Sequence, residues 1–244
     1  MHDAGCRELI TSSDHHGSTT MIVAIDGTVA SGKSSAARIL AAKLGCLYIN
    51  TGLMYRGVAA AARRAGIPTT DTARLASCAQ ALMIGLVGRA DGQHVIVNGE
   101  DLTAEATVPD IGTDVSNVAD NEEVRQILVR EQRRLGVEAG NAVLDGRDIG
   151  SVVFPDADIK FFVSASLAER ARRRLADDRG RNPALTLAQV EHAVAARDKR
   201  DRERPVGALI RMPEAIDIDT TANSGPEQTA SQMLQHIQRL RTHP

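Results

Sequence analysis

The sequence predicts an α/β protein whose central sheet is mostly parallel and covered by helices. Three observations support this fold class. A short apolar run at residues 21–26 leads into a glycine-rich segment and then into an alanine-rich, helix-favouring stretch at residues 35–44. Similar apolar runs recur along the chain, separated by segments with helical periodicity. Polar residues follow several of these runs, as in parallel sheets that bind ligands at one edge.

The glycine-rich segment, residues 27–34, reads Gly-Thr-Val-Ala-Ser-Gly-Lys-Ser and matches G-x-x-x-x-G-K-[ST], the phosphate-binding loop. Its context agrees, because the motif requires a strand before it and a helix after it. The glycines let backbone N–H groups crowd around an anion, and the helix N-terminus adds partial positive charge. Lys33 would reach the β and γ phosphates, and Ser34 would ligate Mg²⁺. The sequence therefore predicts a P-loop NTPase-type sheet.

The remaining elements follow from the same patterns. Strands are expected at residues 46–50, 142–144, 159–164 and 215–219. Helices are expected at residues 53–65, 72–83, 121–139, 167–175, 186–204 and 226–240, with a polar loop at 177–183. Residues 67–111 interrupt the alternation, because they contain spaced glycines and an Asn98-Gly99 turn signal. We expect a β-bearing insert there.

Length and composition bound the domain organisation. The 244 residues fit one domain over residues 21–242. Residues 1–20 are polar, and we expect a disordered tail there. Within that tail, a solvated His15-His16 pair is favoured over a metal site. A net charge of −2 and only 2% aromatic residues argue against a nucleic-acid or membrane-surface binder. The three cysteines are too scattered for a disulfide framework or a zinc site, and they indicate the cytoplasm. No apolar run approaches the ~20 residues of a membrane span.

Arginines are the second informative feature. They recur at helical spacing near the C-terminal half, in two groups: Arg170, Arg173 and Arg174, and Arg197 and Arg204 with Asp201 between them. Phosphoryl transfer depends mostly on positioning and charge neutralisation, which converging guanidinium groups supply. The alternative is a solvated helix face of ion pairs with Asp198, Asp201 and Glu203, and for the second group it is at least as well supported.

Two carboxylates follow the apolar run at residues 142–144. Asp145 would hold Mg²⁺-bound water at the strand end, or it belongs to a simple Asp-Gly turn. Asp148, beside Arg147, forms a surface pair or accepts a hydrogen bond from a base amino group. For each of these two carboxylates, the sequence leaves both alternatives open. No residue stands out as a general base.

Three further segments carry a resemblance to a known family. Residues 145–157 (DGRDIGSVVFPDA), 51–56 (TGLMYR) and 197–202 (RDKRDR) closely resemble the signatures of bacterial cytidylate kinases. With the P-loop, the resemblance covers the chain from residue 21 to about residue 240. It implies transfer of the γ-phosphate of ATP to CMP or dCMP with Mg²⁺, in pyrimidine metabolism. It also implies a nucleoside-monophosphate-binding insert at about 67–111 and a short basic lid at about 170–188, in a monomer with only nucleotide partners.

The resemblance also implies residue roles. ATP phosphates would bind the loop residues Gly27, Thr28, Val29, Ala30, Ser31, Gly32, Lys33, Ser34 and Ser35. Catalytic residues would be Lys33, Arg147, Arg170 and Arg174. Arg170 and Arg174 would close on the transferring phosphoryl group from the lid. Metal binding would involve Ser34 and Asp145. The CMP phosphate would bind Arg56 and Arg147. The cytosine would contact Thr51, Arg125, Asp148 and Arg204, and the sugar would contact Ser116, Arg197 and Asp201.

The chain departs from the family pattern at three positions. Thr28 and Ala30 stand where Pro and Gly are frequent, which should matter little because Gly27 and Gly32 remain. Asn50 stands where Asp is usual, and this removes a carboxylate near the metal. Two other functional classes compete with this one. A P-loop kinase for UMP, AMP or a small metabolite stays open, whereas a GTP-binding switch lacks its guanine-reading [NT]-K-x-D motif.

Overall fold

The computed structural model describes residues 20–180 and 182–242, so the predicted tail lies outside the described residues except for residue 20. Within these ranges, five parallel strands form the central sheet in the order β2-β6-β1-β7-β8. Their bounds are β1 Met21–Gly27, β2 Leu47–Asn50, β6 Asn141–Gly146, β7 Ile159–Ser164 and β8 Ile216–Asp219. This parallel sheet confirms the predicted fold class.

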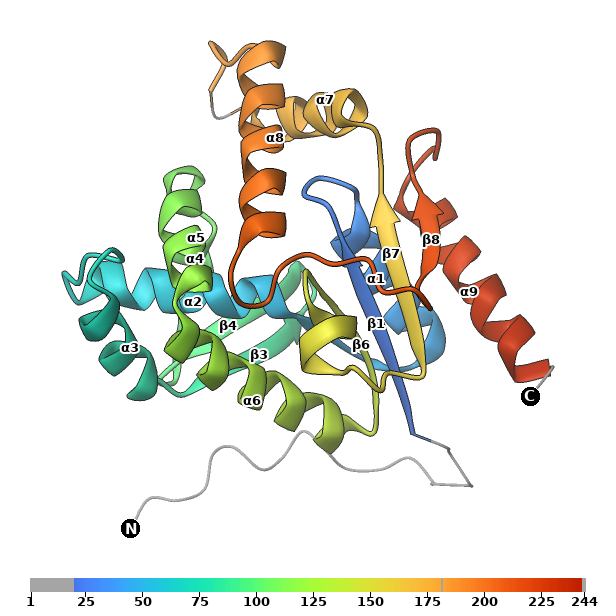
Figure 1. Ribbon diagram of the computed structural model, residues 1–244, viewed down its shortest axis with the longest axis horizontal. Helices are drawn as coiled ribbons and strands as arrows, with labels where there is room; N and C mark the ends of the chain where they lie inside the picture. Colours follow the sequence, from blue (N-terminus) through green and yellow to red (C-terminus); the bar gives the residue numbers. More distant parts are fainter. Residues whose placement is uncertain (1–19, 181, 243–244) are drawn as a thin grey trace.

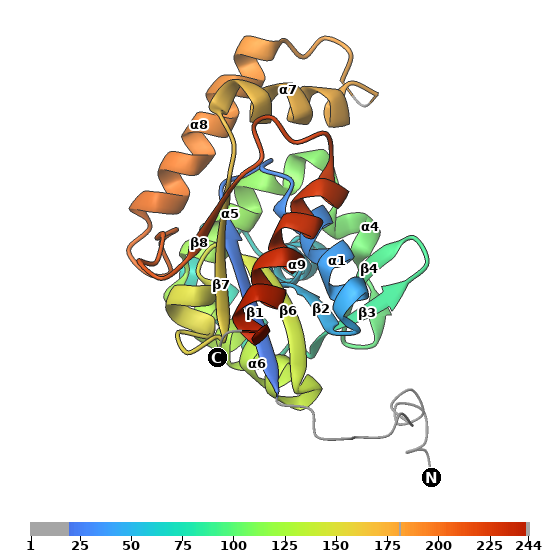
Figure 2. The same ribbon diagram turned by 90° about the vertical axis from the view of Figure 1, so that its right-hand side faces the viewer.

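Helices cover both faces of this sheet (Figures 1 and 2). Helices α1 (Lys33–Leu44) and α9 (Pro226–Thr242) pack on one face, where Val23 and Ile25 of β1 point. Helix α6 (Glu122–Ala139) and a π-helical turn (Ile149–Val153) cover the other face, where Ala24 points. The strands read as nearly continuous apolar runs because both of their faces are buried.

A small antiparallel sheet confirms the expected β-bearing interruption. It consists of β3 (Ile84–Arg89), β4 (Gly92–Val97) and β5 (Glu100–Asp101). The predicted turn joins β4 to β5, with φ of 52° at Asn98 and 83° at Gly99. Helices α2 (Thr51–Arg64), α3 (Thr72–Gln80), α4 (Thr103–Ala106) and α5 (Gly112–Asp120), with a 3₁₀ turn at Pro109–Ile111, share a separate apolar core with this sheet.

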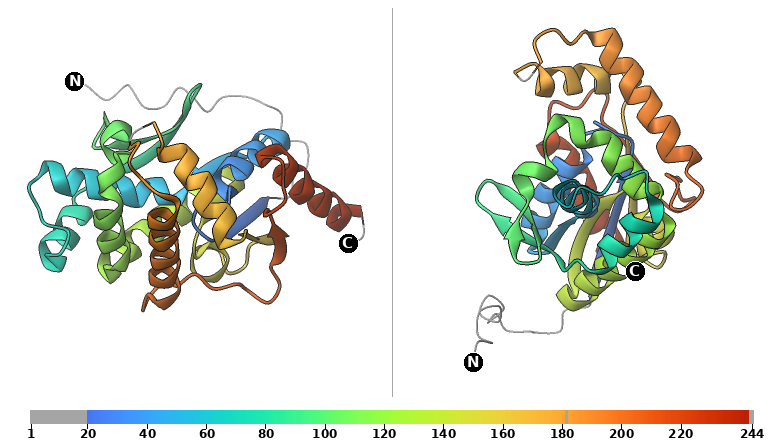
Figure 3. Two further views of the ribbon diagram at one scale, coloured as in Figure 1. Left: turned by 90° about the horizontal axis from the view of Figure 1, so that it is seen from above. Right: turned by 90° about the vertical axis from the view of Figure 1, so that its left-hand side faces the viewer.

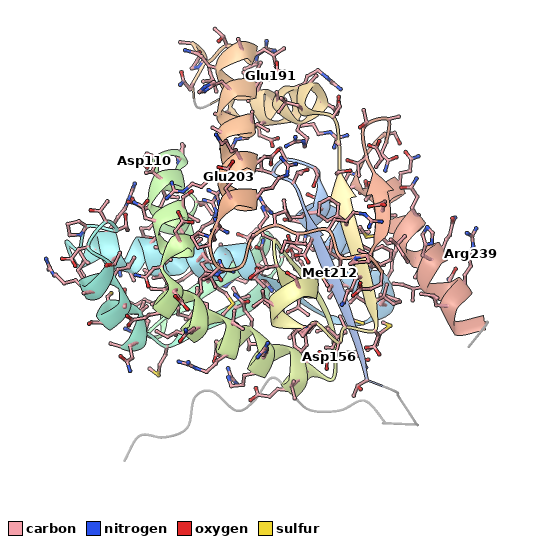
Figure 4. The ribbon with its side chains drawn as sticks, in the orientation of Figure 1. Asp110, Asp156, Glu191, Glu203, Met212 and Arg239 are labelled. Atoms are coloured by element: carbon pink, nitrogen blue, oxygen red, sulfur yellow. The ribbon has the colours of Figure 1, made fainter. Side chains whose placement is uncertain are left out.

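Two helices extend beyond the carboxyl ends of the strands (Figures 2 and 3). They are α7 (Leu167–Asp178) and α8 (Leu187–Glu203), and they pack on each other through Ala171, Val190 and Val194. Glu191, near the start of α8, and Glu203, its last residue, are labelled in Figure 4. In the part of the chain described here, no helix combines the length and the apolar character that crossing a bilayer requires.

Several predicted boundaries were wrong by a few residues. Helix α2 begins at Thr51 rather than residue 53, because the Asn50 side chain accepts a hydrogen bond from the Leu53 N–H and caps the helix. Helix α3 ends at Gln80 rather than residue 83, since Met83 N–H instead bonds to Asn98 Oδ1 beside β3. Helix α7 continues to Asp178, so the polar loop expected at 177–183 starts later.

Helix α2 approaches the small sheet most closely at Gly57. A Cβ atom there would lie 2.7 Å from Val95 Cγ2 of β4. We therefore expect Gly57→Ala to lower the free energy of unfolding by about 1–2 kcal/mol, because overpacking outweighs the higher helix propensity of alanine. Urea unfolding measures this change.

The control is Gly112→Ala in α5, where a Cβ would meet no atom within 4 Å. This variant should be as stable as the native protein or slightly more stable. Equal stability changes in the two variants would contradict the close packing of α2 on β4.

Candidate active site

The loop after β1 has the geometry of a phosphate-binding loop. Gly27 is required because a Cβ would lie 2.0 Å from the carbonyl oxygen of Val163 on β7. Gly32, with φ of 83°, starts α1 without a side-chain cap, so the N–H groups of the first turn face outward. Ser31 Oγ donates to Thr28 O at 2.9 Å, and Lys33 Nζ lies 3.4 Å from the same oxygen. Lys33 is thus held over the loop.

An oxygen pair lies at the end of the neighbouring strand. Ser34 Oγ donates to Asp145 Oδ2 at 2.5 Å, and Tyr48 Oη donates to Asp145 Oδ1 at 2.8 Å. Thr51 Oγ1 donates to the Asp145 backbone oxygen at 2.8 Å. Asp145 is therefore fixed beside the loop serine instead of being only a turn residue. Hydroxyl and carboxylate oxygens are the ligands that Mg²⁺ prefers.

A cavity of about 370 Å³ opens between this loop, α2, α5, the end of β6 and α8. Its lining includes most of the residues predicted to bind CMP and part of the loop. Those predicted residues are Val29, Ala30, Lys33, Ser34, Thr51, Arg56, Arg125, Asp145, Arg147, Asp148, Arg197 and Arg204. Residues that were not predicted also line it, namely Asn50, Gly52, Leu53, Tyr55, Thr107, Val115, Ala119 and Gly146.

Positive charge dominates the cavity wall. Six of its side chains are cationic, Lys33, Arg56, Arg125, Arg147, Arg197 and Arg204, against two carboxylates, Asp145 and Asp148. Burial and the nearby charge of Arg147 lower the pKa of Lys33 to about 7. Burial and three neighbouring arginines lower the pKa of Arg56. The cavity is therefore built to receive an anion, which would relieve this repulsion.

Asp201 organises the arginines from behind the wall. It is fully buried, and its carboxylate accepts from Arg147 Nε at 2.8 Å, Arg204 Nη2 at 2.9 Å and Arg197 Nε at 3.2 Å. Burial alone would raise the pKa of Asp201, but the guanidinium groups lower it overall. Arg197 Nη1 also donates to Ser116 Oγ at 2.7 Å. The alternative of a solvated ion-pair face was therefore wrong for this cluster.

A buried ion pair forms the far wall of the cavity. Arg125 Nη2 donates to Asp148 Oδ2, and Arg125 Nη1 donates to the Ala119 carbonyl oxygen at 3.0 Å. The Arg125 guanidinium also lies 5.4 Å from the centre of the Tyr55 ring. Burial raises the pKa of Asp148 even though Arg125 favours its ionised form. A carboxylate beside a guanidinium can recognise a ligand edge that both donates and accepts hydrogen bonds.

Two predicted catalytic arginines do not reach the cavity wall. Arg170 is buried and pairs with Asp198 at 2.6 Å, and its Nη1 donates to the Val29 carbonyl oxygen of the loop at 3.2 Å. Arg174 donates to Asp178 at 2.7 Å along α7. The charge of Arg174 still contributes to the lowered pKa of Arg56. Their predicted convergence on the site is thus not formed, because acidic residues of α7 and α8 hold both side chains.

A second cavity, of about 330 Å³, lies on the other side of the loop. Loop residues Ser31, Gly32 and Ser35 line it together with Glu169, Arg172 and Arg173 of α7. Residues 220 and 223–226, which follow β8, form another part of its lining. The phosphate-binding loop therefore stands between two hollows.

Sequence reasoning missed Asp26, which ends the apolar run directly before the loop. Its carboxylate is buried and accepts from Ile149 N and Gly150 N, each at 2.8 Å. These bonds hold the turn that follows Arg147 and Asp148. A lone acidic residue at the end of an apolar strand is the signal that could have identified it. The role of Asn50 was also missed, since its side chain caps α2.

Together, the parallel sheet, the loop and the cationic cavity define a P-loop nucleotide-binding protein. A family model described as "Cytidylate kinase" matches residues 23–239, and the chain belongs to this family. It is 45% identical over 224 residues to the cytidylate kinase of Symbiobacterium thermophilum, covering 91% of this chain and 98% of that protein. It is 39% identical to the Bacillus subtilis cytidylate kinase, covering 89% and 96%.

A solved structure shows a likeness in fold. The crystal structure of an uncharacterized protein from Eubacterium ventriosum aligns with a TM-score of 0.50 at 12% identity. The alignment covers 90% of this chain and 99% of that chain.

The environment of Asp26 predicts a pH effect on stability. Burial raises its pKa to about 7, with Asp148 adding to the rise and Arg147 opposing it. The folded protein therefore holds a proton that the unfolded chain releases, so the stabilisation present at low pH is lost as pH rises towards about 7. We expect the native protein to lose stability relative to Asp26→Asn between about pH 4 and 7, and the difference to level off above that range.

Urea unfolding of both proteins across this range measures the effect, since most other titrating groups are common to the two. A stability difference that stays constant from acidic to neutral pH would contradict it.

Proposed function

We propose that this protein is a kinase that transfers the γ-phosphate of ATP to CMP or dCMP. One observation carries the proposal: a phosphate-binding loop faces a cluster of arginines across a single cavity. Phosphoryl transfer between two nucleotides requires two polyanions to meet, and fixed cations offset their repulsion. Membership of the cytidylate kinase family supports this reaction over other uses of a P-loop.

The two cavities suggest which substrate binds on each side of the loop. ATP would place its phosphates on the loop, near Gly27, Thr28, Lys33 and Ser34, with its nucleoside end in the cavity lined by Ser35 and Arg173. CMP would occupy the larger cavity. The two phosphate chains would then meet at the loop, where Lys33 can reach the transferring group.

On the CMP side, Arg56 and Arg147 would bind the phosphate. The base would lie against Asp148 and Arg125, whose acceptor and donor match the amino group and ring acceptors of cytosine. Two further residues, Thr51 and Arg204, would complete the base pocket. The sugar would lie against Arg197, which Ser116 and Asp201 hold in place. A wrong base would leave the buried Asp148–Arg125 pair partly unsatisfied, and this would give selectivity.

The segment at about residues 67–111, which contains α3, the small sheet and α4, would act as the CMP-binding insert. The segment at about residues 170–188, which contains most of α7 and the start of α8, would act as the lid. Arg170 and Arg174 would contribute to transfer if α7 moves towards the loop and their present acidic partners are exchanged for phosphate. Closure would exclude water, which would otherwise accept the phosphoryl group.

Magnesium fits the oxygen pair at Ser34 and Asp145. Mg²⁺ commonly binds one or two protein oxygens together with substrate phosphates, so a larger cluster of protein ligands is not required. When bound, it would neutralise phosphate charge. Tyr48 holds the Asp145 carboxylate in position for this role. The CMP phosphate is already a nucleophile, so no side chain needs to act as a general base.

We also propose that the enzyme works in the cytoplasm, in pyrimidine nucleotide metabolism, as a monomer. The three scattered cysteines of the sequence are typical of a reducing compartment.

The substrate range tests the proposal. Purified protein with ATP and Mg²⁺ should phosphorylate CMP and dCMP with higher kcat/KM than UMP or AMP, measured by coupled ADP release. Lys33→Ala should lower kcat by about two to four orders of magnitude while the protein stays folded, because Lys33 acts on phosphate charge. A preference for AMP, or ATP binding without turnover of any monophosphate, would contradict the proposal.

The base pocket is tested separately with Asp148→Asn, which keeps the size of the side chain. We expect KM for CMP to rise about 10- to 100-fold, because a charged acceptor is lost in a buried site, while KM for ATP changes little. Asp156→Asn serves as the control, since Asp156 is exposed and lies away from the cavity (Figure 4). An equal rise for both substrates would remove Asp148 from the base pocket.

A further inference from the structure

One edge of the central sheet is completed by a side chain. Strand β2 is an edge strand that pairs with β6 alone. On its open side, the Gln93 side chain of β4 donates from Nε2 to the Tyr48 carbonyl oxygen at 2.5 Å. Its Oε1 atom accepts from the Asn50 backbone N–H at 2.8 Å. Gln93 thus binds both backbone groups that flank Ile49.

These two bonds reproduce what a sixth parallel strand would offer. In a parallel ladder, one residue donates to the carbonyl before its partner residue and accepts from the N–H after it. The primary amide of Gln93 supplies both a donor and an acceptor, which neither a carboxylate nor an apolar side chain can do. The small sheet is therefore hydrogen-bonded to the central sheet at this point, although the two sheets share no strand pairing.

The same contact reaches the cavity wall, because Asn50 itself lines the cavity. Asn50 is held by Gln93 through its backbone, and its side chain accepts from Leu53 N–H at 3.1 Å to start α2. The first turns of α2 carry Thr51 and Arg56, and both line the larger cavity. A shift of the Asn50 backbone would therefore move residues that face the CMP site.

We propose that Gln93 is a positioning residue for CMP binding, which fixes the start of α2 by completing the edge of β2. This inference rests on the proposed CMP kinase activity. Gln93 is not among the residues that line the cavity, so it acts through Asn50 and α2 and not by touching substrate. Lys33 is one step further from this contact, because it begins α1 after the loop and its ammonium group lies beside Thr28 O.

The test is Gln93→Met, which keeps the length of the side chain and removes both hydrogen bonds. We expect KM for CMP to rise about three- to tenfold, with kcat and KM for ATP within about twofold of the native values. Hydrogen–deuterium exchange should become faster in a peptide spanning residues 47–53, because the Asn50 N–H loses its acceptor. Gln80→Met is the control, since Gln80 is exposed on α3 of the same part of the molecule.

If Gln93→Met does not fold, Gln93→Glu replaces it. Glutamate retains an acceptor for Asn50 N–H and loses the donor to Tyr48, so exchange at Asn50 should stay slow and KM for CMP should stay within about twofold of the native value. A raised KM for CMP with slow exchange at Asn50 would overturn the proposal. Unchanged exchange in Gln93→Met, or faster exchange with an unchanged KM for CMP, would overturn the proposal. An inactive native protein would instead overturn the proposed function, and the exchange measurement would still report on the Gln93 contact.

Discussion

The arrangement of charge around the site depends on one buried carboxylate. Asp201 has no exposed surface, and it accepts hydrogen bonds from Arg147 just after β6, from Arg197 of α8 and from Arg204 just after α8. A buried charge is tolerated only when it is paired and its oxygens are hydrogen-bonded. Here the pairing connects the central sheet to α8, so the same contact that satisfies Asp201 also closes one wall of the cavity.

This pairing leaves the cavity with uncompensated positive charge. Burial and neighbouring cations lower the pKa values of Lys33, Arg56 and Arg197, which means that the folded protein holds these charges against their mutual repulsion. Such an arrangement costs stability in the free protein and is repaid when an anion binds. A site with this charge already in place does not need to reorganise during transfer, which is the main source of electrostatic catalysis.

The local patterns of the sequence were sufficient for the parallel sheet, the phosphate-binding loop and the position of Asp145. Each of these depends on residues that are close in sequence, or on the rule that parallel strands end at one edge. Contacts between distant segments could not be predicted. Asp26 contacts residues more than a hundred positions away. From the sequence, Asp198 and Asp201 could belong to a solvent-exposed helix face. Helical spacing shows which residues share a face, but it does not show what packs on that face.

The loop itself shows how tertiary contacts hold a strained backbone. Ala30 has φ of 58°, a left-handed conformation that costs a non-glycine residue about 1–2 kcal/mol. The two residues before Ala30 are held by hydrogen bonds: Thr28 N–H donates to Val163 O at 3.2 Å, and Val29 N–H donates to Asp198 Oδ1 at 3.3 Å.

The second of these contacts has chemical meaning, because a loop N–H that would suit a phosphate oxygen here donates to a carboxylate of α8. Arg170 neutralises that carboxylate and donates to the Val29 carbonyl oxygen. In this structure, a carboxylate of α8 is therefore hydrogen-bonded to the backbone of the loop. The position of the α7–α8 pair is thus linked physically to what occupies the loop.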